Sequence, residues 1–165
     1  MTYFFFGTLM DLDVLAAVLD RPLTGSELSQ AWLRGYRRVR AATASYPVLV
    51  PAAKLLVGGV LFQPQSERDE IRIRHFEGEE YVDRWLMVRL PGGRRRPARV
   101  FFSLEALGRT DHPWNLAEWA QEHKAAFLEQ CREWMRDCPE CEADATVDLG
   151  LEAKVAGWRR RPPGR

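Results

Sequence analysis

Apolar residues recur along this chain with two periods, one typical of strands and one typical of helices. Residues 2–6 include a tyrosine followed by three phenylalanines, which predicts a buried first strand. Residues 11–19 place their larger apolar side chains on one face, which predicts a short amphipathic helix ending before Pro22. Further strand-like segments, broken by small and turn-forming residues, follow at 31–40, 46–52 and 54–62.

The segment 54–62, KLLVGGVLF, is apolar on both faces, as expected of a central strand. Its glycine pair predicts either a bulge or the close approach of another backbone. A short helix is predicted next at 66–76, with Ser66 as its N-cap. The segments 83–90 and 96–102 flank the sequence PGGRR, which is a hairpin signal.

The clearest helical pattern begins at Asn115, where Glu118 three residues later resembles a capping box. Apolar residues then recur at helical spacing up to Cys138, and we interpret their aromatic members as core packing. Several short strands, two or three helices and this long C-terminal helix predict an α+β domain. We expect residues 1–141 to form one domain and residues 142–165 a partly flexible extension.

Composition agrees with a single globular domain. The 165 residues carry 24 Lys and Arg against 23 Asp and Glu, a net charge of +1 that argues against a chain-wide nucleic-acid or membrane-surface role. We interpret the arginine runs at 94–96 and 159–161 as a solvated turn and a frayed tail. No signal peptide or membrane-spanning run is evident, and three cysteines without signs of secretion predict a cytoplasmic protein.

Two short stretches could contribute chemistry. The first strand ends at Gly7-Thr8-Leu9, and a glycine at such a corner lets successive backbone N–H groups approach an anion. The second stretch is HFEGEEY, residues 75–81, between a helix and an apolar strand. If the chain is extended there, Glu77 and Glu79 share one side, and neighbouring charge and burial would raise a carboxyl pKa towards that of a general acid/base.

In this order and separation, the two stretches resemble the gamma-glutamylcyclotransferase-like proteins, and the gamma-glutamylamine branch looks closest. The similar segments cover roughly residues 3–137, and include GYRRVR, YPVLVP and PWNLAEWAQEHKAAFL. The resemblance implies a small mixed β-barrel flanked by helices, with the long helix at the C-terminus. It also implies a monomeric or weakly dimeric enzyme that acts on a small γ-glutamyl substrate, with no cofactor, metal, nucleic-acid or membrane partner.

By that resemblance, the substrate's α-amine attacks its own γ-glutamyl carbonyl, which releases 5-oxoproline and an amine. Glu77 matches the family's proton-transferring glutamate. The other matching residues would bind substrate: Phe6, Gly7, Thr8, Leu9, Tyr46 and Tyr81. The chain departs from the family at Phe6, where a tyrosine is usual. It also departs at His75, which we expect to be exposed but which could instead tune the pKa of Glu77.

Other functions fit parts of the sequence. The fold could serve as a non-catalytic module that binds a small metabolite, or as a γ-glutamyl transfer or deprotection enzyme with another substrate. His75-Phe76-Glu77 with Cys138-Pro139-Glu140-Cys141 superficially matches zinc deaminases, but Asp137 stands where they have proline. A redox C-x-x-C would need a thioredoxin-like context, which the pattern lacks. We interpret Cys131 and Cys138 as buried thiols.

Overall fold

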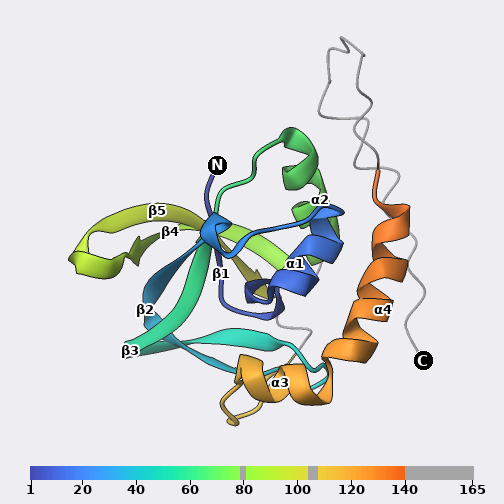
Figure 1. Cartoon of the computed structure of the whole chain (residues 1–165). Helices are drawn as coiled ribbons and strands as arrows, with labels where there is room; N and C mark the ends of the chain where they lie inside the picture. Colours follow the sequence, from blue (N-terminus) through green and yellow to red (C-terminus); the bar gives the residue numbers. More distant parts are fainter. Residues whose placement is uncertain (79–80, 104–107, 140–165) are drawn as a thin grey trace, which may run out of the picture.

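The computed structural model describes residues 1–78, 81–103 and 108–139 (Figure 1). Glu79, Glu80 and the predicted extension from residue 142 lie outside these ranges. The strands and α-helices are β1 (Tyr3–Phe5), α1 (Leu12–Leu19), β2 (Leu28–Arg40), β3 (Pro47–Phe62), α2 (Glu67–Glu77), β4 (Tyr81–Arg89), β5 (Arg95–Ser103), α3 (Leu116–Glu122) and α4 (Lys124–Trp134). Short 3-10 turns are η1 (Thr8–Met10), η2 (Gly25–Glu27), η3 (Pro91–Gly93) and η5 (Met135–Asp137).

The five strands close into a barrel in the order β1-β3-β2-β4-β5, which confirms the predicted barrel fold. β2 and β3 form a long antiparallel ribbon that sweeps along one side of the molecule (Figure 1). β1 is antiparallel to β3 and makes a single parallel pairing with β5, between Tyr3 and Arg99. This parallel contact makes the sheet mixed.

The strand segments predicted separately at 46–52 and 54–62 are one strand, β3, of 16 residues. β2 pairs along it with one register shift, between Arg34 and Tyr36, where Gly35 has a φ of 91°. The glycine pair in β3 therefore marks a close approach and not a bulge. A Cβ at Gly59 would collide with the Phe5 carbonyl oxygen and lie 2.6 Å from the Phe4 ring.

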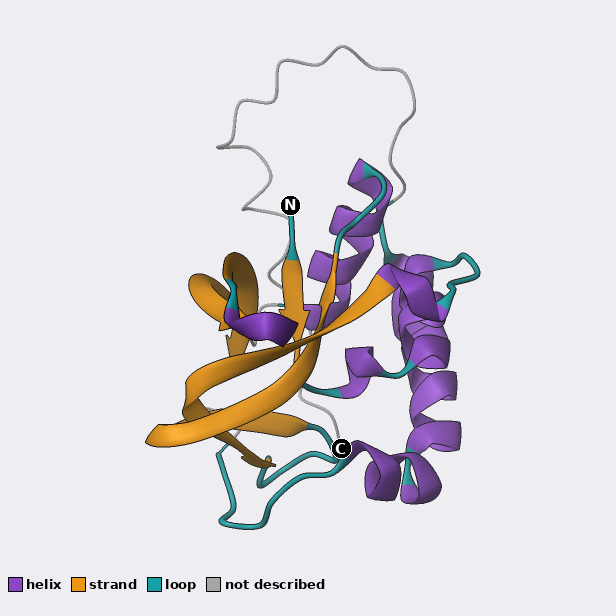
Figure 2. Ribbon diagram, turned by 60° about the vertical axis from the view of Figure 1, so that its left-hand side comes forward, coloured by secondary structure: helices purple, strands orange, loops and turns teal. Residues whose placement is uncertain are grey.

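β1 joins two cores because successive strand residues point to opposite faces. Phe4 belongs to the barrel interior, together with residues such as Val88 and Val100. Tyr3 and Phe5 belong to a second core beneath the α-helices, which lie together on one side of the barrel (Figure 2). The first strand is thus buried on both faces, as its run of aromatic residues predicts.

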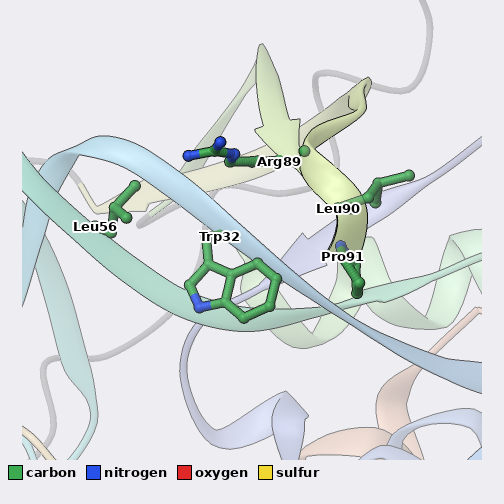
Figure 3. A pocket seen from close by; sticks show the side chains of 7 residues that line it. Trp32, Leu56, Arg89, Leu90 and Pro91 are labelled. Atoms are coloured by element: carbon green, nitrogen blue, oxygen red, sulfur yellow. The ribbon is translucent and has the colours of Figure 1, made fainter.

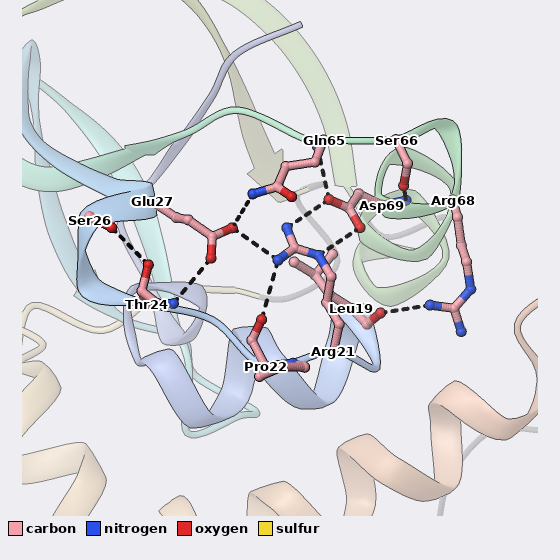
Figure 4. Close-up of polar contacts among 10 residues, drawn as sticks. All are labelled: Leu19, Arg21, Pro22, Thr24, Ser26, Glu27, Gln65, Ser66, Arg68 and Asp69. Carbon is pink, nitrogen blue, oxygen red and sulfur yellow. Dashed lines mark hydrogen bonds and ion pairs between the residues drawn. The ribbon is translucent and has the colours of Figure 1, made fainter.

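A network of polar side chains fixes the start of α2 against the end of α1 (Figure 4). The Asp69 carboxylate accepts hydrogen bonds from Arg21 Nη2 at 2.9 Å and from the Gln65 backbone N–H at 3.0 Å. Arg21 also donates to Glu27 at 2.9 Å. Ser66 caps the helix, as predicted, by accepting from the Asp69 backbone N–H.

The predicted C-terminal helical pattern contains a break at His123, whose φ of −126° separates α3 from α4. Asn115 caps α3, as predicted, by accepting from the Ala117 and Glu118 backbone N–H groups. After the break, Lys124 at the start of α4 binds Asp11 at 2.8 Å and Asp13 at 2.7 Å, and these ion pairs hold α4 against the start of α1. α4 and η5 together form a C-terminal helical segment of 14 residues.

Two further expectations concern the described ranges. Cys131 and Cys138 are both buried, as predicted, and burial raises the pKa of Cys131 to about 11. Among the residues that the structure describes, every helix is too short or too polar to cross a bilayer.

Candidate active site

The turn that follows β1 is built from η1 and its neighbours. The Met10 backbone N–H donates to the Gly7 carbonyl at 3.0 Å, and the Asp11 N–H donates to the Thr8 carbonyl at 3.0 Å. Within the described ranges, no hydrogen-bond acceptor faces the backbone N–H groups of Gly7, Thr8 and Leu9. Three successive backbone N–H groups thus have no partner in the described part of the chain, and anion binding by them stays a prediction.

The space around position 7 favours glycine. Its φ of −124° is open to any residue, so conformation alone does not demand glycine. A Cβ there would lie 3.1 Å from Pro47 Cγ, which is tighter than an ordinary van der Waals contact. The turn therefore presses against the beginning of β3.

Glu77 is the last residue of α2, and Gly78 ends that helix with a φ of 67°. The chain is not extended at Glu77, because the helix, predicted to end at Phe76, continues through it. Its side chain retains some contact with solvent, yet burial among protein atoms raises its pKa to about 8. No ion pair or hydrogen bond to this carboxyl comes from the described part of the chain.

A short series of contacts connects the two stretches. Tyr46 precedes Pro47, which touches Gly7. The Tyr46 ring packs against Tyr81 with centroids 6.4 Å apart, and Tyr81 begins β4 four residues after Glu77. These contacts join the turn to both tyrosines, and the second tyrosine follows the end of α2 closely in the chain.

Most of the chain is similar to one known protein family. The model described as Gamma-glutamyl cyclotransferase, AIG2-like, matches residues 3–121, which is well over half of the chain. The chain belongs to this gamma-glutamyl cyclotransferase family. AIG2-like protein A of Arabidopsis thaliana is 28% identical over 134 residues, which cover 80% of this chain and 79% of that protein.

Solved structures agree on the fold of this cyclotransferase-family chain. The solution structure of an Arabidopsis thaliana protein has a TM-score of 0.56 at 24% identity, over 84% of this chain and 94% of that one. A protein described as gamma-glutamyl cyclotransferase has a TM-score of 0.50 at 10% identity, over 92% and 95%. At these identities the likeness establishes the shared barrel and helical layer.

Phe6 contributes to this region in a way that the sequence does not reveal. Its ring is buried in the barrel core, so its side chain faces away from the following turn. Its carbonyl oxygen instead accepts a hydrogen bond from Arg38 Nη1 at 2.7 Å. Arg38 was not singled out from the sequence. The alternation of residues in GYRRVR would have indicated its role only if the segment beside this part of β2 had been known.

The expectation that His75 is exposed is wrong. Its ring is half-buried and stacks on Trp134 with centroids 5.2 Å apart. The Trp134 Nε1–H donates to the His75 carbonyl at 3.1 Å, so these two residues lock α2 to α4. His75 therefore has a packing role beside Glu77.

Two other features of this cyclotransferase-family chain were considered as sites. A shallow hollow of about 360 Å³ lies outside the barrel between Trp32, Leu56, Arg89 and η3 (Figure 3). It offers no carboxylate or nucleophile, so we do not place the chemistry there. Among the described residues, no three metal-ligating side chains gather, and Cys141 of the deaminase-like pattern lies outside those residues.

Proposed function

We propose that this chain releases 5-oxoproline from a γ-glutamyl amine or amide by intramolecular cyclisation. The observation that supports this most is Glu77, a carboxyl with a pKa of about 8 and no partner among the described residues. A carboxyl with a pKa near neutrality can both accept and donate a proton under working conditions, which is the requirement for a general acid/base.

The turn after β1 supplies the proposed binding element. The unpaired N–H groups of Gly7, Thr8 and Leu9 would bind the substrate's α-carboxylate. Tyr46 and Tyr81 would line the wall between this turn and Glu77. Phe6 contributes through its backbone carbonyl, because its ring belongs to the barrel core.

Glu77 would move the protons. In its ionised form it accepts a proton from the substrate's α-ammonium group, and the freed amine attacks the γ-carbonyl carbon. The new carbon–nitrogen bond closes a five-membered ring, and the bond to the departing amine breaks. Glu77 delivers that proton to the departing nitrogen, and the second proton that the ring nitrogen loses on forming the lactam is also taken up by the departing amine. The reaction therefore ends with 5-oxoproline, the amine as its ammonium ion, and Glu77 ionised again as at the start.

Holding the substrate in a folded conformer is the main task of the protein in this proposal. Well-oriented intramolecular attack can be worth on the order of 7–11 kcal/mol. Proton transfer by Glu77 would contribute roughly 10²–10⁴-fold more. The reaction moves protons and one acyl group, so we propose that it uses neither a metal nor an organic cofactor. The resemblance to the gamma-glutamylamine branch further suggests amines as leaving groups.

The test is release of 5-oxoproline from a panel of γ-glutamyl amines, peptides and amino acids. We expect wild type to release it from at least one class, and Glu77→Gln to lose roughly 10²–10⁴-fold in kcat while still binding that substrate. Glu67→Gln is the matched control, since it removes an exposed carboxylate from the other end of the same helix and should keep full activity.

Near-normal turnover by Glu77→Gln would refute the role of Glu77. Silence of wild type across the panel, together with binding of a γ-glutamyl ligand, would favour the non-catalytic metabolite-binding module. The replacement of the family's tyrosine by Phe6 is the observation that keeps this second function in view.

A further inference from the structure

Arg38 lies directly behind the turn that we assign to carboxylate binding. From β2, its Nη1 donates to the Phe6 carbonyl at 2.7 Å and approaches the Gly58 carbonyl at 3.4 Å. Its guanidinium lies 5.1 Å from the centre of the Trp114 ring. The side chain therefore connects the end of β1 with β3, immediately before the amides of Gly7, Thr8 and Leu9.

The charge of Arg38 has no counter-ion among the described residues. Several other arginines of the chain are paired with carboxylates, among them Arg21 with Asp69, Arg68 with Asp20, and Arg99 with Asp83. A partly buried cation is costly unless an anion offsets its desolvation. Burial indeed lowers the pKa of Arg38. A bound anion would supply the missing partner.

The Arg38 guanidinium also has N–H donors that no described residue accepts from. Its hydrogen bonds to described residues all come from Nη1, whereas Nε and Nη2 have no acceptor there and are not fully buried. Arginine has five N–H donors in a planar fork that matches a carboxylate. Arg38 can therefore hold the Phe6 carbonyl and still offer charge and hydrogen bonds to a ligand.

We propose that Arg38 is a positioning and specificity-determining residue that fixes the turn after β1 and makes the site select ligands with a free α-carboxylate. This inference rests on the proposed function of the same site. Because the carboxylate is bound alike before and during ring closure, loss of Arg38 should raise KM and leave kcat nearly unchanged. Loss of the Glu77 carboxyl should instead lower kcat and leave KM nearly unchanged.

The experiment compares binding of 5-oxoproline with binding of its uncharged primary amide, by calorimetry, for wild type and variants. Arg38→Gln keeps a donor for the Phe6 carbonyl but removes the charge. We expect it to weaken 5-oxoproline binding about 10–100-fold and to change amide binding less than about two-fold. Arg37→Gln is the matched control, because Arg37 pairs with the exposed Asp111 and should leave both affinities unchanged.

Unaltered affinity for 5-oxoproline, or an equal loss for acid and amide, would overturn the proposal. If Arg38→Gln does not fold, Arg38→Lys is measured instead, and it should retain the preference for the acid over the amide. Loss of that preference in the folded Lys variant would also overturn the proposal. The binding assay needs no turnover, so failure of the cyclotransferase proposal and failure of the Arg38 assignment give different results.

Discussion

The two ends of α2 present the same chemical group in opposite surroundings. At the N-terminal end, burial alone would raise the pKa of Asp69, but hydrogen bonds from Arg21 and Gln65 outweigh it and hold the pKa below its usual value. At the C-terminal end, burial raises the pKa of Glu77 to about 8, with no described group to oppose it. One carboxyl is stabilised as an anion for structure, and the other is left available for proton transfer.

Two arginines show the same contrast. Hydrogen bonding to Asp69 raises the pKa of Arg21, whereas desolvation lowers the pKa of Arg38. The paired groups lie where α1 and α2 must be joined, and the unpaired groups lie around the candidate site. An unpaired ionisable group stabilises the protein only when a ligand or a proton binds to it. Unpaired groups therefore indicate a functional site, and paired groups indicate a structural role.

The largest effect on stability is expected at the paired end. Asp69→Asn leaves Arg21 with Glu27 as its remaining charged partner and removes the charge from a buried, hydrogen-bonded position, so it should lower the free energy of unfolding by about 3 kcal/mol at pH 7. The pKa of Asp69 is lowered in the fold, so its contribution is present above its ordinary value of 3.8 and is lost as the pH falls further. Urea unfolding at pH 7 and pH 3 measures both.

Asp20→Asn is the matched control for Asp69, because Asp20 forms an exposed pair with Arg68. Its effect should stay below about 1 kcal/mol. Equal losses for the two variants would mean that the Asp69 network does not fix α2.

A smaller effect on stability, of opposite sign, is expected at the C-terminal end of α2, where Glu77 has no partner among the described residues. The pKa of Glu77 is raised in the fold, so the native state binds a proton more tightly, and stability falls as pH rises from 4.5 to about 8. Glu77→Gln removes this dependence. The variant should gain roughly 1–2 kcal/mol over wild type at pH 8 relative to pH 5, since solvent contact of the carboxyl reduces the full effect. Parallel unfolding curves across this range would contradict the raised pKa.

The smallest effect on stability is expected at the N-cap of α2, and it tests whether the two ends of this helix act independently. Ser66→Ala removes the N-cap and should cost about 1 kcal/mol in thermal or urea unfolding. It should leave turnover of whichever panel substrate wild type cyclises unchanged, because Glu77 lies at the far end of α2. A change in kcat would show that the two ends are coupled through the helix.

Local signals in the sequence account for much of the fold. The aromatic run of β1, the caps at Ser66 and Asn115, and the β4–β5 hairpin all follow from neighbouring residues, and the structure confirms them. The break at His123 was not predicted from neighbouring residues, and the ion pairs that Lys124 makes directly after it, with Asp11 and Asp13, join residues more than 100 positions apart in the chain.

The site was predicted less completely than the fold, for the same reason. Glu77 and the turn at Gly7 are visible as short motifs, and their roles stay predictions. The helical backbone of Glu77 was not predicted. The glycine that ends α2, Gly78, comes after Glu77, so the helix includes Glu77. Arg38 was missed because nothing in GYRRVR shows that β2 passes behind the end of β1.

Gly59 has a consequence for how this protein can diverge. Its missing side chain lets β3 lie directly against Phe4 and the carbonyl of Phe5, and the turn proposed to bind the substrate begins two residues after Phe5. Even a methyl group at position 59 would displace that strand outward and carry the turn with it. A substitution at Gly59, which lies outside the proposed binding residues, would thereby change the affinity for the proposed ligand.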